Sequence, residues 1–434
     1  MVAMKIIMVL NSAFSICGKG YMADCLHYNY KPIMKMVRRI RQSSLRSKLW
    51  QIVLSAGDFL VLFSLKMTVS HRKNDKTAVL VVRFDAIGDF ILWLDAAKEI
   101  RRIYPNSQYD ITLMANEDWF ELAKKTSYFD HVWPINRSNF YRKLLYRYRV
   151  LCRVQRSSFD IGIQSSCPRR FYHHDAIVRF TGAPHRVGLT GDWSNITQRH
   201  ARKSDQWYTK LVSLSPNAEH ELDRNAALVR KLGQKEFIAA VSVLRGSFPH
   251  RKIPSRDYFV LFPGAGWNGR MWPAGRFGEI ARRIYRKTGW CCVICGGPGE
   301  IYTAAKISEQ KDDIPMHNLA GKTSLLALVG IIQKARFVVA NETSAIHIAT
   351  AVATPSVCIL GGGHYGRFVP YPKRLRSNKA IPVPVYRRMD CFGCNWECIF
   401  DVEDGDAVPC IKGISVEAVW EATFEAVERD EKPC

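Results

Sequence analysis

The chain has few acidic residues for its size. Its 434 residues include 63 Lys and Arg against 39 Asp and Glu, which gives a formal net charge of +24. Such a balance favours anionic partners: nucleic acid, an anionic membrane face or a phosphorylated substrate. Helix-turn-helix, zinc-finger and aromatic RNA-binding signatures are missing, and the basic residues are spread along the chain. We therefore expect no nucleic-acid partner.

The sequence also lacks a long apolar run. The most apolar stretch, residues 51–69, is interrupted by Asp58 and Lys66, and a membrane-spanning helix needs about 20 apolar residues. No clear cleavage site follows the short apolar run at the N-terminus, so we do not expect a signal peptide. Residues 26–57 contain no acid and seven basic residues: Lys31, Lys35, Arg38, Arg39, Arg41, Arg46 and Lys48. This pattern indicates either an interfacial anchor on an anionic membrane face or a helical extension packed on the protein's own surface.

The cysteines do not suggest a disulfide scaffold, because 13 is an odd number in a long chain. A reducing, cytoplasmic location fits better, with peripheral attachment to the inner face of the membrane if the N-terminal region is an anchor. Four cysteines form a C-x2-C-x3-C-x11-C cluster: Cys391, Cys394, Cys398 and Cys410. Four thiolates at this spacing could hold a structural zinc or iron. Alternatively, the four cysteines are reduced and only contribute to the packing of a C-terminal segment.

Short apolar strands alternate with amphipathic helices in two successive series. The first series has strands at 78–82, 109–115 and 159–164 and helices at 91–104 and 119–126. The second has strands at 258–262, 290–295, 336–340 and 356–360 and helices at 274–288, 299–309, 323–334 and 343–353. Two such series predict an α/β protein with two Rossmann-like, doubly wound parallel sheets facing a central cleft. We expect an N-terminal helical extension over 1–75, one domain over 76–250, and a second over 251–434 that contains the cysteine cluster and a closing C-terminal helix.

The stretch VLFPGAGWNGRMWP (260–273) contains a formal G-x-G-x-x-G dinucleotide fingerprint. Pro273 marks the helix start, four residues after the last glycine, so the loop is too long for the tight turn of that motif. We therefore do not expect an NAD-linked oxidoreductase. A glycine-rich loop carrying Arg270 still suits an anion, because its backbone amides, beginning at Gly264, and the guanidinium group match phosphate oxygens.

Three further loops carry polar residues at strand ends. In VVRFDAIGDF (81–90), Asp89 falls in the first turn of a helix, where it is either a general base or an ordinary helix cap. In CGGPGE (295–300), Glu300 could accept from ribose hydroxyls. In VVANETSAIHIATAVATP (338–355), Thr343 and Ser344 begin a helix, with His347 one turn later. That arrangement predicts an anion site or, alternatively, a capped helix with a buried histidine.

Taken together, these loops suggest a nucleotide-sugar donor in the second domain and an acceptor hydroxyl activated by Asp89 across the cleft. The blocks VLVVRFDAIGDFILWLDAAKEIRRIYP, VLFPGAGWNGRMWPAGRFGEIARRI, NLAGKTSLLALVGII and FVVANETSAIHIATAVATPSVCILGGGHYGRFVP resemble, in order and spacing, the lipopolysaccharide heptosyltransferase family. The resemblance to this family, glycosyltransferase family 9 with the GT-B fold, extends over roughly residues 77–425.

The resemblance implies roles for individual residues. Asp89 would be the general base, Arg270 would stand in for a phosphate-binding lysine, and Glu300 would bind ribose. Thr343, Ser344 and His347 would match the diphosphate-binding helix start. Glu342 and Ser344 replace the family's usual Asp and Gly there, which bears on the identity of the donor; Arg270 keeps the positive charge of lysine with a different geometry. The cysteine cluster loosely resembles the iron-binding cysteines of members that modify autotransporter proteins.

We therefore expect an inverting glycosyltransferase that needs no cofactor for catalysis. The family default implies ADP-heptose as donor and a lipopolysaccharide-core, lipid-linked or related cell-envelope glycan as acceptor. Two alternatives stay open: a protein heptosyltransferase of the autotransporter type, and a non-catalytic nucleotide-sugar-binding protein. The presence of Asp89 argues against the second.

Overall fold

The computed structural model describes residues 45–65, 75–192, 194–215, 218–249, 253, 257–309, 314–375, 377–378 and 380–431. The chain divides into two units, 1–67 and 68–434, and each is described by itself. In the first unit, residues Leu45–Leu65 form one helix, α3. No helix in the described part of the chain is long and apolar enough to span a membrane. The predicted basic stretch up to Arg41 and the start of the linker, residues 70–74, lie outside the described residues.

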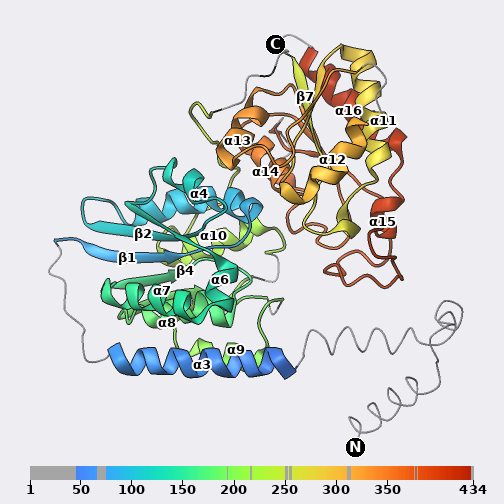
Figure 1. Cartoon of the computed structure of the whole chain (residues 1–434). Coiled ribbons are helices and arrows are strands. Elements are labelled where there is room, and N and C mark those ends of the chain that lie inside the picture. Colours follow the sequence, from blue (N-terminus) through green and yellow to red (C-terminus); the bar gives the residue numbers. More distant parts are fainter. Residues whose placement is uncertain are drawn as a thin grey trace, which may run out of the picture. The chain divides into compact units, whose positions relative to one another are not determined.

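The second unit contains two six-stranded sheets, and every strand pair in them is parallel. The first sheet has the order β3-β2-β1-β4-β5-β6. Its strands are β1 (Thr77–Val82), β2 (Tyr109–Asn116), β3 (His131–Ile135), β4 (Ile161–Gln164), β5 (His185–Leu189) and β6 (Lys210–Val212). The helices around it are α4 (Ile87–Ile103), α5 (Phe120–Lys124), α6 (Arg137–Arg142), α7 (Leu144–Arg156), α8 (Ala176–Phe180), α9 (Gln198–Asp205) and α10 (Glu221–Leu232), with a π-helical turn at Phe171–Asp175 (Figure 1).

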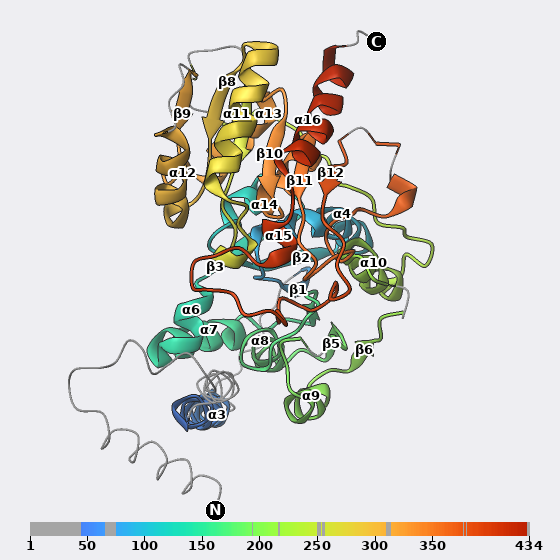
Figure 2. The same ribbon diagram turned by 90° about the vertical axis from the view of Figure 1, so that its right-hand side faces the viewer.

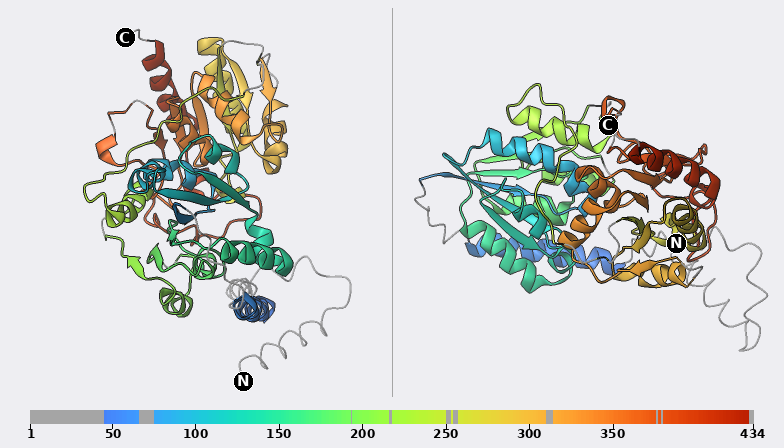
Figure 3. Two further views of the ribbon diagram at one scale, coloured as in Figure 1. Left: turned by 90° about the vertical axis from the view of Figure 1, so that its left-hand side faces the viewer. Right: turned by 90° about the horizontal axis from the view of Figure 1, so that it is seen from above.

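The second sheet repeats the same topology, with the order β12-β11-β10-β7-β8-β9. Its strands are β7 (Tyr258–Phe262), β8 (Cys291–Ile294), β9 (Met316–Asn318), β10 (Val338–Asn341), β11 (Ser356–Ile359) and β12 (Val383–Val385). Its helices are α11 (Ala274–Thr288), α12 (Ile301–Ser308), α13 (Leu325–Lys334), α14 (Ser344–Ala351), α15 (Pro409–Lys412) and α16 (Val416–Glu431). Three 3-10 turns accompany them, at Asn268–Arg270, Pro298–Glu300 and Lys373–Leu375. Figure 3 shows the two sheets and their helices from two further sides.

The central strands are buried on both faces, as their composition predicts. Residues 79–82 of β1 and all of β7 are buried, and both read as continuous apolar runs. Such runs are typical of parallel strands covered by helices on each side. The structure thus confirms the predicted fold class of two doubly wound sheets, and α11 occupies the predicted residues 274–288.

Some predicted elements differ in extent or position. Helix α4 begins at Ile87, four residues before the predicted start, so that Asp89 lies in its first turn. The C-terminal helix α16 packs on α11 and on strand β11 of its own sheet (Figure 2).

The predicted domain borders remain predictions. The strands of the two sheets lie within residues 77–212 and 258–385.

In both sheets the strand order reverses beside the first strand, between β1 and β4 and between β7 and β10. Ligands of doubly wound folds bind at this reversal, beyond the carboxyl ends of the strands. The loops after β1, β7 and β10 lie at these positions, and they carry Asp89, Arg270 and Thr343.

Candidate active site

The loop after β1 presents Asp89 at the start of α4. Asp89 is half-buried in the first helical turn, where the free amides and the helix dipole favour a negative charge. Burial raises the pKa of Asp89 to about 6, and the neighbouring Asp85 adds to this effect. The charges of Arg83 and Arg367 act in the opposite direction. A carboxylate with a pKa near the working pH suits general-base chemistry.

Arg83 holds this loop in place from inside the protein. Its side chain is fully buried, and its guanidinium group donates to the carbonyl oxygens of Ser165 (2.7 Å) and Asp89 (3.2 Å) and to Asn225 Oδ1 (3.0 Å). It also forms an ion pair with Asp85 (3.0 Å). A buried guanidinium group is tolerated only with such partners, so Arg83 ties β1, β4 and α10 to the backbone of the predicted base.

On the second sheet, Arg270 is held at the side of the predicted phosphate site. Its Nη2 donates to the Glu342 carbonyl oxygen (2.9 Å) and lies 3.3 Å from Glu342 Oε2. Its guanidinium group also lies over the Trp396 ring, 4.7 Å from the centroid. Burial raises the pKa of Glu342 to about 7, although Arg270 lowers it. Arg270 of the predicted anion clamp therefore has an internal carboxylate as its partner.

Glu300 lies against three glycines. A Cβ atom would come within 2.2 Å of Glu300 Cγ at Gly264, within 2.9 Å of Glu300 Cβ at Gly296, and within 2.9 Å of Glu300 Oε2 at Gly297. Gly264 thus permits the close approach of a carboxylate from the next strand end, while Gly296 and Gly297 belong to the loop of Glu300 itself. This is a different reason for glycine from the dinucleotide turn, and the 3-10 turn at Asn268–Arg270 confirms that no helix starts directly after these glycines.

The start of α14 has its predicted form. Thr343 is the N-cap, and its Oγ1 accepts from the amide of Ala345 (3.3 Å). His347 is buried, with Nδ1 2.8 Å from the Tyr371 hydroxyl. Burial lowers the pKa of His347 to about 3, so the imidazole is neutral at physiological pH. His347 can therefore act on an anion as a neutral hydrogen-bond donor, and not as a cation.

The two halves meet where α4 and α14 begin. A Cβ atom at Gly88 would lie 2.9 Å from His347 Cδ2 and 3.8 Å from Ser344 Cα. Only glycine permits this approach, which brings the loop of Asp89 next to the helix start of Thr343 and Ser344. The structure thus joins a candidate base from the first sheet to a candidate anion site from the second.

Known proteins share this fold and sequence pattern. The model of glycosyltransferase family 9 (heptosyltransferase) matches residues 147–389, more than half of the chain. The chain belongs to glycosyltransferase family 9. The chain is 19% identical to lipopolysaccharide heptosyltransferase 3 of Escherichia coli over 288 residues, 63% of this chain and 80% of the relative. It is 24% identical to lipooligosaccharide heptosyltransferase 2 of Haemophilus ducreyi over 293 residues, 64% of this chain and 80% of the relative.

A solved structure confirms the GT-B fold of this family 9 glycosyltransferase. The structure of E. coli ADP-heptose lps heptosyltransferase II aligns with a TM-score of 0.61 and 18% identity, covering 82% of this chain and 100% of that chain. Its membership of family 9 makes the protein a glycosyltransferase of the heptosyltransferase type.

The four cysteines of the cluster line one cavity, together with Gly362, Met389 and Trp396. Cys410 is buried and its Sγ accepts from the Gly362 amide (3.5 Å), while Cys391, Cys394 and Cys398 are half-buried. All four are free thiols. No group of three or more His, Cys, Asp or Glu side chains in the described ranges has the geometry of a metal site.

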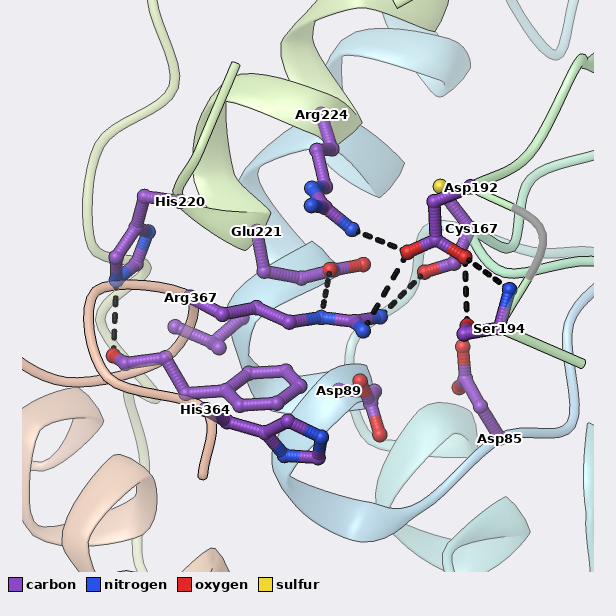
Figure 4. A network of polar contacts seen from close by, with 12 residues as sticks. Asp85, Asp89, Cys167, Asp192, Ser194, His220, Glu221, Arg224, His364 and Arg367 are labelled. Atoms are coloured by element: carbon purple, nitrogen blue, oxygen red, sulfur yellow. Dashed lines mark hydrogen bonds and ion pairs between the residues drawn. The ribbon is translucent and has the colours of Figure 1, made fainter. Parts of the chain in front are cut away.

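Sequence reasoning missed three charged residues of this region. Arg83 and Glu221 are buried and Arg367 is half-buried; the two arginines lie near Glu221 and act on Asp89, and Figure 4 shows Glu221 and Arg367 beside Asp89. Arg83 was the easier one to find, because it directly follows an apolar strand. Glu221 and Arg367 lie far apart in sequence, and no local pattern links them.

Gly264 and Gly266 provide a matched test of the Glu300 pocket. Gly264→Ala would force the Glu300 side chain away, whereas a Cβ at Gly266 meets no atom within 4 Å. If Glu300 binds ribose, we expect Gly264→Ala to weaken ADP binding about 10-fold, because a hydrogen bond to a charged group contributes about 1.5–3 kcal/mol. Isothermal titration calorimetry checks this. Equal affinities of the two variants would contradict the role of Glu300.

The raised pKa of Glu342 predicts that nucleotide binding depends on pH. A diphosphate at Arg270 brings negative charge next to Glu342, whose pKa is already about 7, so binding should take up a proton. Between pH 6.5 and 8 we expect the ADP affinity of the wild type to fall about 3-fold or more relative to Glu342→Gln. The protonation of ADP itself affects the affinities of wild type and Glu342→Gln equally, so it cancels in this comparison. Glu279→Gln is the control, since Glu279 pairs with Arg282 and Arg283 on α11, and it should behave as wild type.

Proposed function

We propose that this enzyme is an inverting glycosyltransferase that moves heptose from ADP-heptose to a hydroxyl of a lipopolysaccharide-core or related cell-envelope glycan. The observation that carries the proposal is the contact between the Asp89 loop and the start of α14 at Gly88. This contact leaves a base and an anion-binding helix start on the two sides of one reaction centre.

In the proposed reaction, Asp89 takes the proton of the acceptor hydroxyl while its oxygen attacks the anomeric carbon. The bond from that carbon to the diphosphate breaks on the opposite face, so the configuration inverts. The leaving diphosphate gains negative charge, which the guanidinium of Arg270, the free amides at Ser344 and the neutral imidazole of His347 would stabilise. These fixed donors supply the stabilisation without a cofactor.

The donor assignment rests on family membership and on the position of Glu300 beside Gly264. The E. coli structure that shares the fold is of an ADP-heptose enzyme, and Glu300 beside Gly264 offers a carboxylate for ribose hydroxyls. Ser344 supplies a hydroxyl at the helix start, and Glu342 places a titrating carboxylate beside Arg270. We assign donor binding to the second domain and acceptor binding to the first.

Positive charge supports an anionic acceptor. The net charge of the chain is +24, and in the first half burial and, to a smaller extent, the nearby charge of Arg137 lower the pKa of the half-buried Arg170. A phosphate or carboxylate on the acceptor would relieve this repulsion. We further propose that the basic N-terminal region holds the enzyme peripherally at the cytoplasmic face of the inner membrane, near a lipid-linked acceptor.

Asp89→Asn tests the base. We expect kcat to fall about 100-fold or more, because general-base catalysis contributes about 10²–10⁴-fold, while ADP-heptose still binds. In the wild type, kcat/KM should rise with pH through about 6, where Asp89 loses its proton. Asp223→Asn is the control, because Asp223 also lies in the first turn of a helix, α10. Transfer is measured by ADP release with a core-glycan acceptor and with an autotransporter polypeptide.

The same preparations identify the donor. Thermal stabilisation by ADP and ADP-heptose, and not by UDP, GDP or CMP, supports the proposed donor. Stabilisation by a different nucleotide would contradict it, and no stabilisation by any would favour a non-catalytic protein. An Asp89→Asn enzyme that binds donor and turns over at the wild-type rate would refute the general base. Transfer to the autotransporter polypeptide alone would contradict the glycan acceptor and identify a protein acceptor.

We also propose a structural zinc or iron bound by Cys391, Cys394, Cys398 and Cys410. The proposal rests on the chemistry of the four thiols, which line one cavity and include a C-x2-C pair; their side chains do not have the geometry of a metal site in the described structure and would have to rearrange to bind the metal. The metal would fix residues 389–410 and have no part in sugar transfer. We expect about one metal per chain by mass spectrometry, and loss of metal with a lower Tm in Cys391→Ser/Cys394→Ser. Cys152→Ser, in α7, should keep the metal. A metal-free wild type purified without oxygen would refute the site.

A further inference from the structure

Arg367 extends from the second half of the enzyme into the first. It lies on the loop after β11, and its side chain is only 14% exposed. Its guanidinium group donates to the Cys167 carbonyl oxygen (3.2 Å) and lies 3.4 Å from Asp192 Oδ2 and 3.5 Å from Glu221 Oε2 (Figure 4). All three partners belong to the first half.

The backbone of the same loop also holds the start of α10. The amide of Glu221 donates to the Arg367 carbonyl oxygen (2.8 Å), and His220 Nε2 lies 2.8 Å from the Phe368 carbonyl oxygen. The loop therefore fixes both the position of Glu221 and the charge that faces it.

Three successive glycines allow the loop of Arg367 to pack closely against aromatic side chains of its own half. A Cβ atom at Gly361 or Gly363 would lie within 2.5 Å of the Trp396 ring, and one at Gly362 within 2.2 Å of Phe392. His364 bonds Asn395 through Nε2 (2.8 Å) and accepts from Trp396 Nε1 at Nδ1 (3.2 Å). Arg367 is thus rigidly attached to the half that we assign to the donor.

One buried and two half-buried carboxylates lie near two cations in this region. Asp85 and Asp89 from the base loop and Glu221 from α10 lie together with Arg83 and Arg367. No described residue donates a hydrogen bond to either carboxylate oxygen of the fully buried Glu221. From α14 the group that faces the Asp89 loop is the neutral His347, and His364 adds a second imidazole, whose pKa burial lowers to about 4. Without Arg367, Asp89 would depend on Arg83 for a compensating positive charge, while Arg224 would still act on Glu221.

We propose that Arg367 is a positioning residue for sugar transfer: it brings from the donor half the second cation that keeps Asp89 ionised. This inference rests on the proposed role of Asp89 as the base. It means that the donor half supplies part of the positive charge that keeps the base ionised while the two halves are joined. The opposing actions of burial and of Arg367 on the pKa of Asp89 agree with this reading.

The acid limb of the pH profile of kcat/KM tests the inference. Loss of a nearby opposite charge raises the pKa of a carboxyl group, so Arg367→Gln should move the limb upward by about one pH unit. At pH 6 its kcat/KM should then lie about 5-fold further below its own plateau than that of the wild type. Arg367→Lys keeps the charge and should keep the limb. Glu221→Gln removes a competing negative charge and should move the limb to lower pH.

Arg374→Gln is the matched control. Arg374 also joins the two halves, through Asp223 (2.7 Å) and the Ala239 carbonyl oxygen (3.2 Å), but it does not face the buried carboxylates. Its loss should leave the limb unchanged. A folded Arg367→Gln enzyme with the wild-type limb, an equal shift in Arg374→Gln, or an unshifted limb in Glu221→Gln would overturn the inference. If Asp89→Asn retains the wild-type rate, the base assignment itself fails; if that variant is inactive while the limb stays fixed in Arg367→Gln, only the role of Arg367 fails.

Discussion

The close approach of two helix starts at Gly88 is the constraint on which the reaction centre depends. Helices α4 and α14 both point their N-terminal ends toward this contact, and each end carries partial positive charge. Two such ends repel each other unless anions lie beside them. Asp89 supplies one anion and Glu342 lies next to the other end. A sugar diphosphate would supply the charge that the junction is built to accept.

The charges behind that junction are buried and therefore have to be shared. Arg83 is fully buried and bonds carbonyl oxygens and carboxylates from three elements, so its removal would leave several polar groups without a partner. Glu221 is equally buried and depends on cations from both halves. Because burial of unpaired charge is costly, this network favours one arrangement of the two halves over others.

In the second half, the side chain of Trp396 contacts two parts of the candidate site. Trp396 lies over Arg270 and also packs on Gly361 and Gly363, so the cysteine-rich segment supports both the candidate phosphate residue and the loop of Arg367. A metal bound by the four cysteines would stiffen this support without touching substrate. The cysteine cluster and the transfer chemistry are thereby connected through packing.

The sequence by itself determined the elements and the loops that carry the candidate site. Apolar strands, Pro273 before α11 and Gly88 before Asp89 are local signals, and local signals suffice to predict two doubly wound sheets and to reject the dinucleotide fingerprint. Only the tertiary structure decided the charge states and partners: the neutral His347, the pairing of Arg270 with Glu342, and the convergence of Arg367 and Glu221 on Asp89. These depend on burial and on contacts between residues far apart in the chain, which no sequence period encodes.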